Sequence, residues 1–224
     1  MTNPLLTLGD AGQAVWLDFL DQKILKNGEL QRLIDQDGVK GLTSNPSIFE
    51  KAIGEGDDYD ARLKAALDKG DAEIIDLYEA VAIADIQAAA DQFRPVYDRL
   101  RGQDGYVSLE VSPYLAMDTQ ATIAEARRLW RAVDRPNLMV KIPATEEGIP
   151  AIEQCIADGM NINITLIFSL ERYRAVVEAY LRGLERLVAS GGDPSKVASV
   201  ASFFVSRVDS EADKRLEALG KGAL

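Results

Sequence analysis

Six short apolar runs recur along the chain, and each is followed by a longer segment whose apolar residues have helical spacing. This alternation is typical of βα units, whose strands lie side by side in a parallel sheet. The predicted strands cover residues 15–20, 39–44, 106–111, 138–143, 161–168 and 199–205. The pattern therefore restricts the chain to an α/β fold.

The number of units narrows the fold further. A TIM (β/α)8 barrel uses eight βα units in about 250 residues, whereas this chain has six predicted units in 224 residues. Two architectures fit: an open sheet, or a TIM barrel with its first six units present and its last two missing. We expect the second, as a single domain over residues 1–224, because no Gly/Ser/Pro-rich linker divides the chain.

Local signals predict where some helices begin and end. Thr122 followed by Glu125 has the spacing of a capping box, which predicts a helix beginning there. A last helix follows the sixth strand, and Gly220 lies where a left-handed cap would end it. The apolar residues predicted to share one face of this last helix are Val208, Ala212, Leu216 and Leu219.

The charge and the cysteine count exclude several classes of protein. The net charge is −11, from 25 Lys and Arg against 36 Asp and Glu, so a nucleic-acid partner is not expected. The single Cys155 cannot form an internal disulfide, and the first residues lack the basic start and apolar run of a secretory signal. No run approaches the roughly 18 apolar residues of a membrane span. We expect a cytoplasmic protein without a membrane partner.

The chain contains no histidine. Ser/His/Asp triads, Cys/His dyads and zinc sites that use histidine are therefore impossible on this chain alone. Acid and base chemistry must use carboxylates, lysine, tyrosine or water.

A lysine interrupts the fourth apolar run, LMVKIP at 138–143. A central strand of a parallel sheet is buried on both faces and normally consists of apolar residues. Burial disfavours a charged ammonium group, and a neutral lysine amine can form a Schiff base with a carbonyl substrate. A lysine paired with a carboxylate at the strand end is the structural alternative, and the strand alone does not decide between the two.

Polar residues interrupt the other predicted strands as well. Alternation places Asn163 and Thr165 on one face of the fifth strand and Ser108 and Glu110 on one face of the third. In a TIM barrel, catalytic residues come from the carboxyl ends of several strands, which meet at one mouth. The residues expected around this mouth are Asp18, Asn45, Glu110, Lys141, Asn163, Thr165, Ser202 and Arg207. An amine, carboxylates, amides, hydroxyls and a guanidinium are the groups needed to cleave a carbon–carbon bond beside a carbonyl.

Four ordered segments resemble the transaldolase family: GLTSNPSIF at 41–49, NLMVKIPAT at 137–145, NINITLIFS at 161–169 and SVASFFVSRVD at 199–209. The spacing of VSLEVSP at 107–113 is most similar to the longer bacterial branch, which includes fusions to glucose-6-phosphate isomerase. The resemblance covers nearly the whole chain. It implies a TIM barrel without metal or cofactor that moves a dihydroxyacetone unit from a ketose phosphate to an aldose phosphate in the pentose phosphate pathway.

The resemblance also implies catalytic roles. Lys141 would form the Schiff base, and Asp18 would be the acid and base at the cleaved bond. Glu110 and Thr165 would hold the water that takes part in forming and hydrolysing the imine. These roles agree with chemistry that uses no histidine.

The substrate-binding residues implied by the resemblance lie on or just after three predicted strands, the second, the fifth and the sixth. Asn45 and Asn163 would bind substrate hydroxyls, and Ser202 would line the cavity. Arg207 would bind the substrate phosphate, although an ion pair with a neighbouring acidic residue is the alternative for this side chain. Phe204 would face the cavity, where it could contact the substrate or pack in the core.

Members of the family complete a seventh and an eighth strand, which are not expected here. The first and sixth strands should then present unpaired edges, which favour association into homo-oligomers. We expect this chain alone to show little or no turnover. Two other readings stay open: a plain aldolase that releases free dihydroxyacetone, and an inactive barrel fragment that acts only in assembly.

Overall fold

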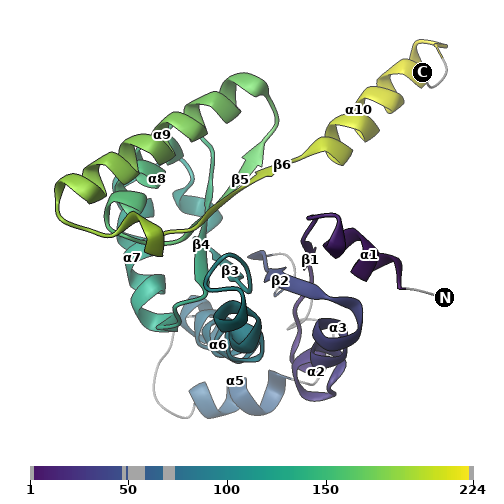
Figure 1. Cartoon of the computed structure of the whole chain (residues 1–224), viewed down its shortest axis with the longest axis vertical. Coiled ribbons are helices and arrows are strands. Elements are labelled where there is room, and N and C mark those ends of the chain that lie inside the picture. Colours follow the sequence, from purple (N-terminus) through teal and green to yellow (C-terminus); the bar gives the residue numbers. More distant parts are fainter. Residues whose placement is uncertain (1–2, 47–48, 50–58, 68–73, 222–224) are drawn as a thin grey trace.

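The computed structural model of the chain describes residues 3–46, 49, 59–67 and 74–221. Six parallel strands form one sheet in the order of the sequence (Figure 1). The strands are β1 (Val15–Leu17), β2 (Val39–Thr43), β3 (Val107–Glu110), β4 (Leu138–Pro143), β5 (Ile162–Ile167) and β6 (Ser199–Phe203). All six predicted strands are confirmed, and β4 has the predicted bounds.

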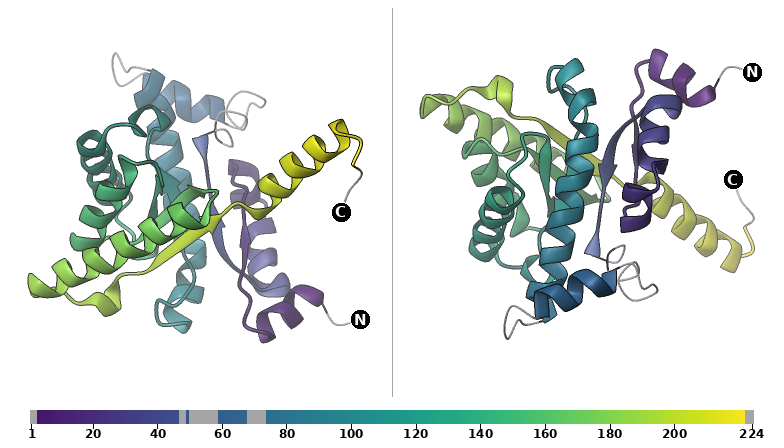
Figure 2. Two further views of the ribbon diagram at one scale, coloured as in Figure 1. Left: turned by 90° about the horizontal axis from the view of Figure 1, so that it is seen from above. Right: turned by 90° about the horizontal axis from the view of Figure 1, so that it is seen from below.

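Helices connect successive strands and lie outside the curved sheet (Figures 1 and 2). The described helices are α1 (Pro4–Asp10), α2 (Gln22–Lys26), α3 (Glu29–Asp37), α5 (Asp60–Leu67), α6 (Ile74–Arg99), α7 (Thr119–Val133), α8 (Gly148–Ala157), α9 (Leu170–Ala189) and α10 (Val205–Ala218). Short 3-10 turns follow β3 and precede β6 at η2 (Pro113–Leu115) and η3 (Pro194–Lys196). The arrangement is a curled half-barrel with the strand order of the first six TIM-barrel units, which confirms the predicted fold class.

The strand register places the predicted polar side chains on one face. Glu110 is paired with Lys141, and Lys141 is paired with Asn163. Because paired residues of adjacent parallel strands point to the same side, these three side chains lie next to one another on the concave face. The period of two in the sequence therefore gives the correct interior face.

The convex face of the sheet and the inner faces of the helices form the apolar core. Every residue of β4 is buried, and Val140 and Ile142 are fully buried. Helices α8 and α9 approach closely at Gly183, where an added Cβ would lie 2.7 Å from the side chain of Ile156. This core fixes β4, and with it the position of Lys141.

The Trp16 ring lies against Gly41 on the neighbouring strand. Trp16 is paired with Gly41, and a Cβ on Gly41 would lie 2.4 Å from the indole ring. The indole Nε1 donates a hydrogen bond to Asp104 Oδ1 at 3.0 Å. Glycine at position 41 therefore leaves the space that the Trp16 ring fills inside the half-barrel.

Two sequence predictions about local structure are wrong. The helix after β3 begins at Thr119 and is capped by Asp118, whose side chain accepts a hydrogen bond from Ala121 N. Thr122 is instead a buried helical residue, and its hydroxyl donates to Leu115 O. β1 ends at Leu17, so Asp18 follows the strand and does not interrupt it.

Helix α10 differs from the other long helices. It projects away from the half-barrel, and none of its residues is buried (Figures 1 and 2). The predicted apolar face is exposed, with Val208 at 43% and Leu219 at 71%. Gly220 has a φ of 68°, as expected for the left-handed end of a helix.

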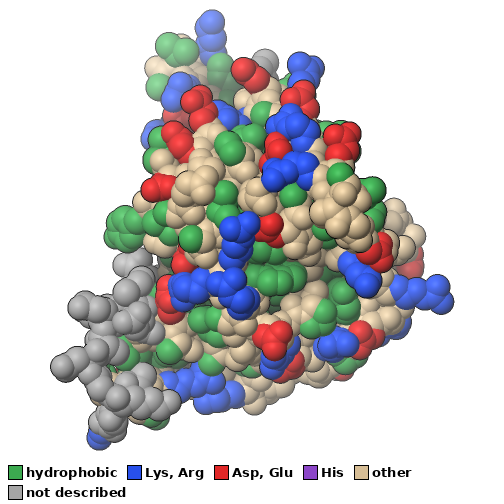
Figure 3. Space-filling view, turned by 90° about the vertical axis from the view of Figure 1, so that its left-hand side faces the viewer, with side chains coloured by type: hydrophobic (Ala, Val, Ile, Leu, Met, Phe, Trp, Pro, Cys, Tyr) green, Lys and Arg blue, Asp and Glu red, His purple; other side chains and the backbone are tan. Residues whose placement is uncertain are grey.

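The outer surface around α7, α8 and α9 carries interspersed acidic and basic side chains (Figure 3). Ion pairs join Arg182 and Arg186 to Glu153 and join Arg127 to Asp158. Within the described part of the chain, no helix has both the length and the apolar composition needed to cross a bilayer.

Candidate active site

A cavity of about 360 Å³ lies at the carboxyl ends of the strands. Seven of the nine predicted site residues line it, together with Pro46, Pro113 and Leu166. The seven are Asp18, Asn45, Glu110, Lys141, Thr165, Phe204 and Arg207. The structure thus brings together residues that are up to 189 positions apart in the sequence (207 − 18).

Among the described residues that line this cavity, Lys141 is the only one with an amine side chain, and it is 8% exposed. Its Nζ donates a hydrogen bond to the Ser44 carbonyl oxygen at 3.2 Å and lies 3.2 Å from Glu110 Oε2. The amine is thus held at the end of a buried strand while its tip reaches the cavity. Lys141 thus has the carboxylate partner of the structural alternative, and it also faces a cavity, as a Schiff-base lysine would need to.

Burial raises the pKa of the Glu110 carboxyl above its usual range. The positive charge of Lys141 opposes this effect and lowers the pKa, while the negative charge of Asp18 raises it further. Burial is the larger influence, so the ion pair with Lys141 does not reverse the direction. A carboxyl whose pKa moves toward neutral pH is suited to proton exchange with a neighbouring group.

Asp18 also lines the cavity and lies just beyond β1. Its carboxylate accepts a hydrogen bond from Thr43 Oγ1 at 2.6 Å. The side chain is exposed, in contrast to the mostly buried Lys141 and Glu110. The cavity therefore contains two carboxylates in different surroundings, and such a pair can take different roles in proton transfer.

Asn163 and Ser202 do not line the cavity but lie beside it in the half-barrel. Asn163 is 1% exposed; its amide donates to Ser108 Oγ at 3.0 Å and accepts from Ser202 Oγ at 3.0 Å. Ser108 is also buried. The three side chains form a hydrogen-bonded chain across β3, β5 and β6.

Phe204 and Arg207 form the outer rim of the cavity. Phe204 immediately precedes α10, and Arg207 is exposed in the first turn of that helix. The guanidinium carbon of Arg207 lies 4.2 Å from the centre of the Phe204 ring. The predicted alternative, an ion pair with a neighbouring acid, is not present in the described residues; Glu211 pairs with Arg215 instead.

Sequence reasoning missed three residues that shape the site. Thr43 holds Asp18, and its only sequence signal is its place at the end of the second strand. Leu166 lines the cavity with a φ of 60°, which is uncommon for a non-glycine residue. Phe168 stacks on Phe204. The conformation of Leu166 has no signal in the sequence.

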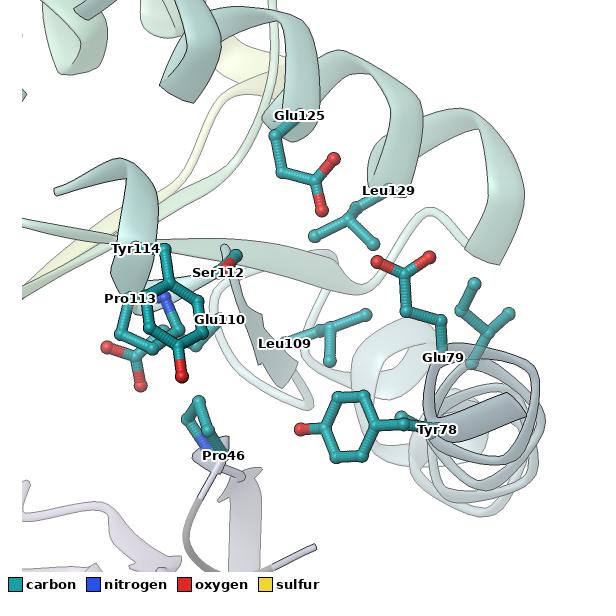
Figure 4. Close-up of a pocket in the computed structure, with 12 residues that line it drawn as sticks. Pro46, Tyr78, Glu79, Leu109, Glu110, Ser112, Pro113, Tyr114, Glu125 and Leu129 are labelled. Atoms are coloured by element: carbon teal, nitrogen blue, oxygen red, sulfur yellow. The ribbon is translucent and has the colours of Figure 1, made fainter. Parts of the chain in front are cut away.

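A second, larger cavity of about 530 Å³ lies beside the first and shares Pro46, Glu110 and Pro113 with it. Figure 4 shows its wall of side chains from α6 and α7, including Glu79 and Glu125. Both of these carboxylates pair with Arg128. The smaller cavity is therefore the better candidate for the chemistry, because Lys141 and Arg207 line it and do not line the larger cavity.

Comparison with known proteins identifies related sequences. The family model for transaldolase/fructose-6-phosphate aldolase matches residues 15–223. A transaldolase of Thermobifida fusca is 56% identical over 219 residues, which cover 96% of this chain and 58% of the relative.

Two other relatives have similar coverage. Transaldolase 2 of Streptomyces coelicolor is 53% identical over 98% of this chain and 59% of its own length. A transaldolase of Saccharopolyspora erythraea is 54% identical over 97% of this chain and 59% of its own length. The chain thus spans about three fifths of the length of these relatives.

Proposed function

This chain belongs to the transaldolase/fructose-6-phosphate aldolase family, and we propose that it carries the Schiff-base site of a transaldolase. The proposed reaction transfers a dihydroxyacetone unit from a ketose phosphate to an aldose phosphate. The observation that carries the proposal is the nearly buried Lys141 amine, which lies beside Glu110 and reaches a cavity that Asp18 also lines.

In the first proposed step, the Lys141 amine attacks the ketose carbonyl to give a carbinolamine, which loses water to form the imine. Glu110 accepts a proton from the nitrogen and returns it to the leaving hydroxyl. Thr165 lies on β5 two residues beyond Asn163, the residue that is paired with Lys141, and it helps to hold the released water. The 3.2 Å separation of Lys141 Nζ and Glu110 Oε2 supports direct proton exchange.

In the second proposed step, Asp18 removes a proton from the hydroxyl beside the bond to be cleaved. The carbon–carbon bond breaks, its electrons move into the protonated imine to form an enamine, and an aldose leaves. The enamine then attacks the carbonyl carbon of an acceptor aldose, and Asp18 returns its proton to the new hydroxyl. Water finally hydrolyses the new imine, which releases the ketose product and the Lys141 amine. The hydrogen bond from Thr43 supports this role because it orients the Asp18 carboxylate.

The remaining site residues would bind the substrate. Asn45 would donate a hydrogen bond to one substrate hydroxyl. Asn163 would give up its hydrogen bond with Ser202 and bind a second substrate hydroxyl. Phe204 would contact the carbon chain. Arg207, at the rim, would bind the phosphate through charge-assisted hydrogen bonds.

Borohydride trapping tests the proposal. The chain is incubated with fructose 6-phosphate, and borohydride reduces any imine that has formed. The protein is then digested, and mass spectrometry identifies the modified residue. We expect a reduced adduct on Lys141 only, absent in Lys141→Ala and also in Lys141→Arg, since a guanidinium stays protonated. Lys196→Ala, at a side chain that is 81% exposed, is the control and should trap normally.

The same experiment separates the alternatives. A three-carbon adduct that persists until an acceptor aldose is added supports a transaldolase. Release of free dihydroxyacetone without an acceptor supports a plain aldolase. No adduct, or an adduct on another lysine, contradicts the proposed site.

We also propose that copies of this chain associate through strand edges. Within the described residues, β1 pairs only with β2, and β6 pairs only with β5. Free backbone N–H and C=O groups at such edges can pair with another chain. Sedimentation velocity should show a mass that rises with protein concentration, and a monomer at all concentrations would contradict this.

A further inference from the structure

Three side chains are stacked at the rim of the candidate active site. The rings of Phe168 and Phe204 are 5.3 Å apart and inclined by 20°, and the Arg207 guanidinium lies over the outer ring, 4.2 Å from the Phe204 centroid. We propose that Phe168 and Phe204 form an aromatic support that positions Arg207 for the anionic end of a sugar phosphate. This inference rests on the proposed function, because it assigns Arg207 to the phosphate.

Arg207 needs such a support because its helix gives it none. No residue of α10 is buried, and Arg207 itself is exposed. Among the described residues, no carboxylate lies within ion-pair distance of Arg207, whereas Arg215 of the same helix is paired with Glu211. The contact with the Phe204 ring is therefore the main restraint on the guanidinium before a ligand binds.

The rings are themselves fixed to the buried part of β5. Phe204 N donates a hydrogen bond to the Ile167 carbonyl oxygen at 3.0 Å, and Ile167 is fully buried. Phe168 directly follows Ile167, so both rings are attached to the same anchored residue. The aromatic support thus holds the exposed Arg207 side chain at a fixed position relative to the buried core.

An irregularity in β5 brings Phe168 to this position. The register with β6 shifts between Ile164 and Ile167, and Leu166 within this interval has a φ of 60°. A bulge changes the direction in which the following side chains point, and bulges are frequent next to active sites. A leucine in the left-handed region persists only where its surroundings determine the conformation. The end of β5 is thus held in one shape that sets the ring positions.

The physical chemistry of the stack suits an arginine that binds phosphate. A ring face attracts a guanidinium, and the contact at a partly exposed site corresponds to a two- to five-fold effect on binding, from about 0.5–1 kcal/mol. The guanidinium carbon lies 4.2 Å from the Phe204 ring centre, so one side of the group contacts the ring while N–H donors remain available to a ligand. Two of these donors can then bind two phosphate oxygens.

The strand offers a matched control at the adjacent position. Phe203 is 37% exposed, which is similar to the 46% of Phe168. Its ring packs edge-to-face against Tyr173 at 6.1 Å and does not take part in the stack under Arg207. Phe203→Leu therefore removes an exposed aromatic ring of the same size without touching the proposed support.

The first measurement is independent of catalysis. The Arg207 Nε–Hε resonance is assigned by its loss in Arg207→Lys, and its proton should be shifted upfield by the ring current of Phe204. Phe204→Leu should abolish this shift, Phe168→Leu should reduce it, and Phe203→Leu should leave it unchanged. Far-UV circular dichroism confirms that each variant is folded. An unshifted resonance in the wild-type chain would overturn the stack.

The second measurement tests the positioning role. Binding of fructose 6-phosphate and of unphosphorylated fructose is titrated for each variant. Phe168→Leu should weaken the phosphorylated ligand about two- to five-fold and leave fructose unchanged, and Phe168→Tyr should restore binding. Phe203→Leu should bind both ligands normally. Because Phe168 does not line the cavity, a loss of direct substrate contact cannot explain the selective effect.

The outcomes separate this inference from the proposed function. If Arg207→Ala weakens fructose 6-phosphate and Phe168→Leu does not, the phosphate role stands and the aromatic support is wrong. If Arg207→Ala binds fructose 6-phosphate as tightly as the wild-type chain, the phosphate role is wrong and the positioning role fails with it. Equal losses for both sugars in Phe168→Leu would show a purely structural role and also overturn the inference.

Discussion

The buried centre of the half-barrel and the β6–α10 arm hold their functional side chains in different ways. Every residue of β4 is buried, and Lys141 is held by Ser44 and Glu110. No residue of α10 is buried, and Arg207 is held by one aromatic ring. The proposed nucleophile, Lys141, is thus positioned by the core, whereas the candidate anion site depends on a local contact. Substitutions at the centre should alter chemistry and stability together, and substitutions in the arm should alter binding alone.

Asp18 tests this division between a buried chemical centre and an exposed binding arm, because its side chain is exposed and yet has a proposed chemical role. Asp18→Asn should still form the imine with fructose 6-phosphate, because Lys141 and Glu110 are unchanged. Cleavage should slow by about 100- to 10,000-fold, as is usual when a general acid or base is lost. Single-turnover measurement of the released aldose gives the rate.

The control for Asp18 is Asp35→Asn, which removes one negative charge from the exposed surface of α3. It should cleave at the wild-type rate. Near-normal cleavage in Asp18→Asn would transfer the proton-transfer role to Glu110, and the chemistry would then lie entirely in the buried centre.

A pair of valines compares the stability of the two regions directly. Val140 of β4 is fully buried, whereas Val208 of α10 is 43% exposed. Val140→Ala should lower the free energy of unfolding by about 2–3 kcal/mol, because it removes two buried methyl groups and leaves a cavity. Val208→Ala should change it by less than about 0.5 kcal/mol. Urea denaturation measures both, and similar values would show that α10 is packed in solution.

The contrast between the regions also explains what the sequence could predict. An apolar run interrupted by Lys141 gave both bounds of β4, because a strand buried on both faces leaves a continuous signal. Alternation placed Glu110, Lys141 and Asn163 on one face, since the period of two is a property of any strand. The candidate site is therefore best predicted where burial is greatest.

The sequence is less informative where the outcome depends on neighbours in space. The helical spacing of Val208 and its partners correctly predicts helix α10, but spacing does not show whether anything covers that face. Thr122 has the sequence of a cap, yet Asp118 provides the cap because the helix begins one turn earlier. The left-handed Leu166 and its effect on Phe168 arise from the register of β5 with β6.

Arg207→Ala tests whether the β6–α10 arm acts in binding and not in stability. Loss of a hydrogen-bonded charge should weaken phosphorylated sugars about 10- to 100-fold and leave unphosphorylated sugars nearly unchanged. Stability should be unaffected, because the side chain is exposed. Arg215→Ala, in the same helix and 76% exposed at the side chain, is the control. Isothermal titration measures both affinities, and equal losses for both sugars would assign Arg207 a structural role.

Glu110→Gln gives the smallest effect, and it tests whether burial controls the centre. Because burial raises the pKa of Glu110, the folded chain holds this proton more tightly than the unfolded chain does. The resulting stabilisation is complete below the usual pKa of a glutamate and is lost as the pH rises through the raised value. Glu110→Gln removes this titration, so wild-type stability should fall relative to the variant as the pH rises.

Glu153→Gln is a control with the opposite sign, because the hydrogen bond from Arg182 lowers the pKa of Glu153. There, wild-type stability should rise relative to the variant as the pH rises through the acidic range. Both variants lose an ion pair, so the comparison uses the slope with pH and not the absolute stability. Urea denaturation between about pH 4 and pH 8 measures the slopes. Slopes of the same sign would show that the attraction of Lys141 exceeds the effect of burial on Glu110, and the centre would then be governed by the same charge pairing as the surface.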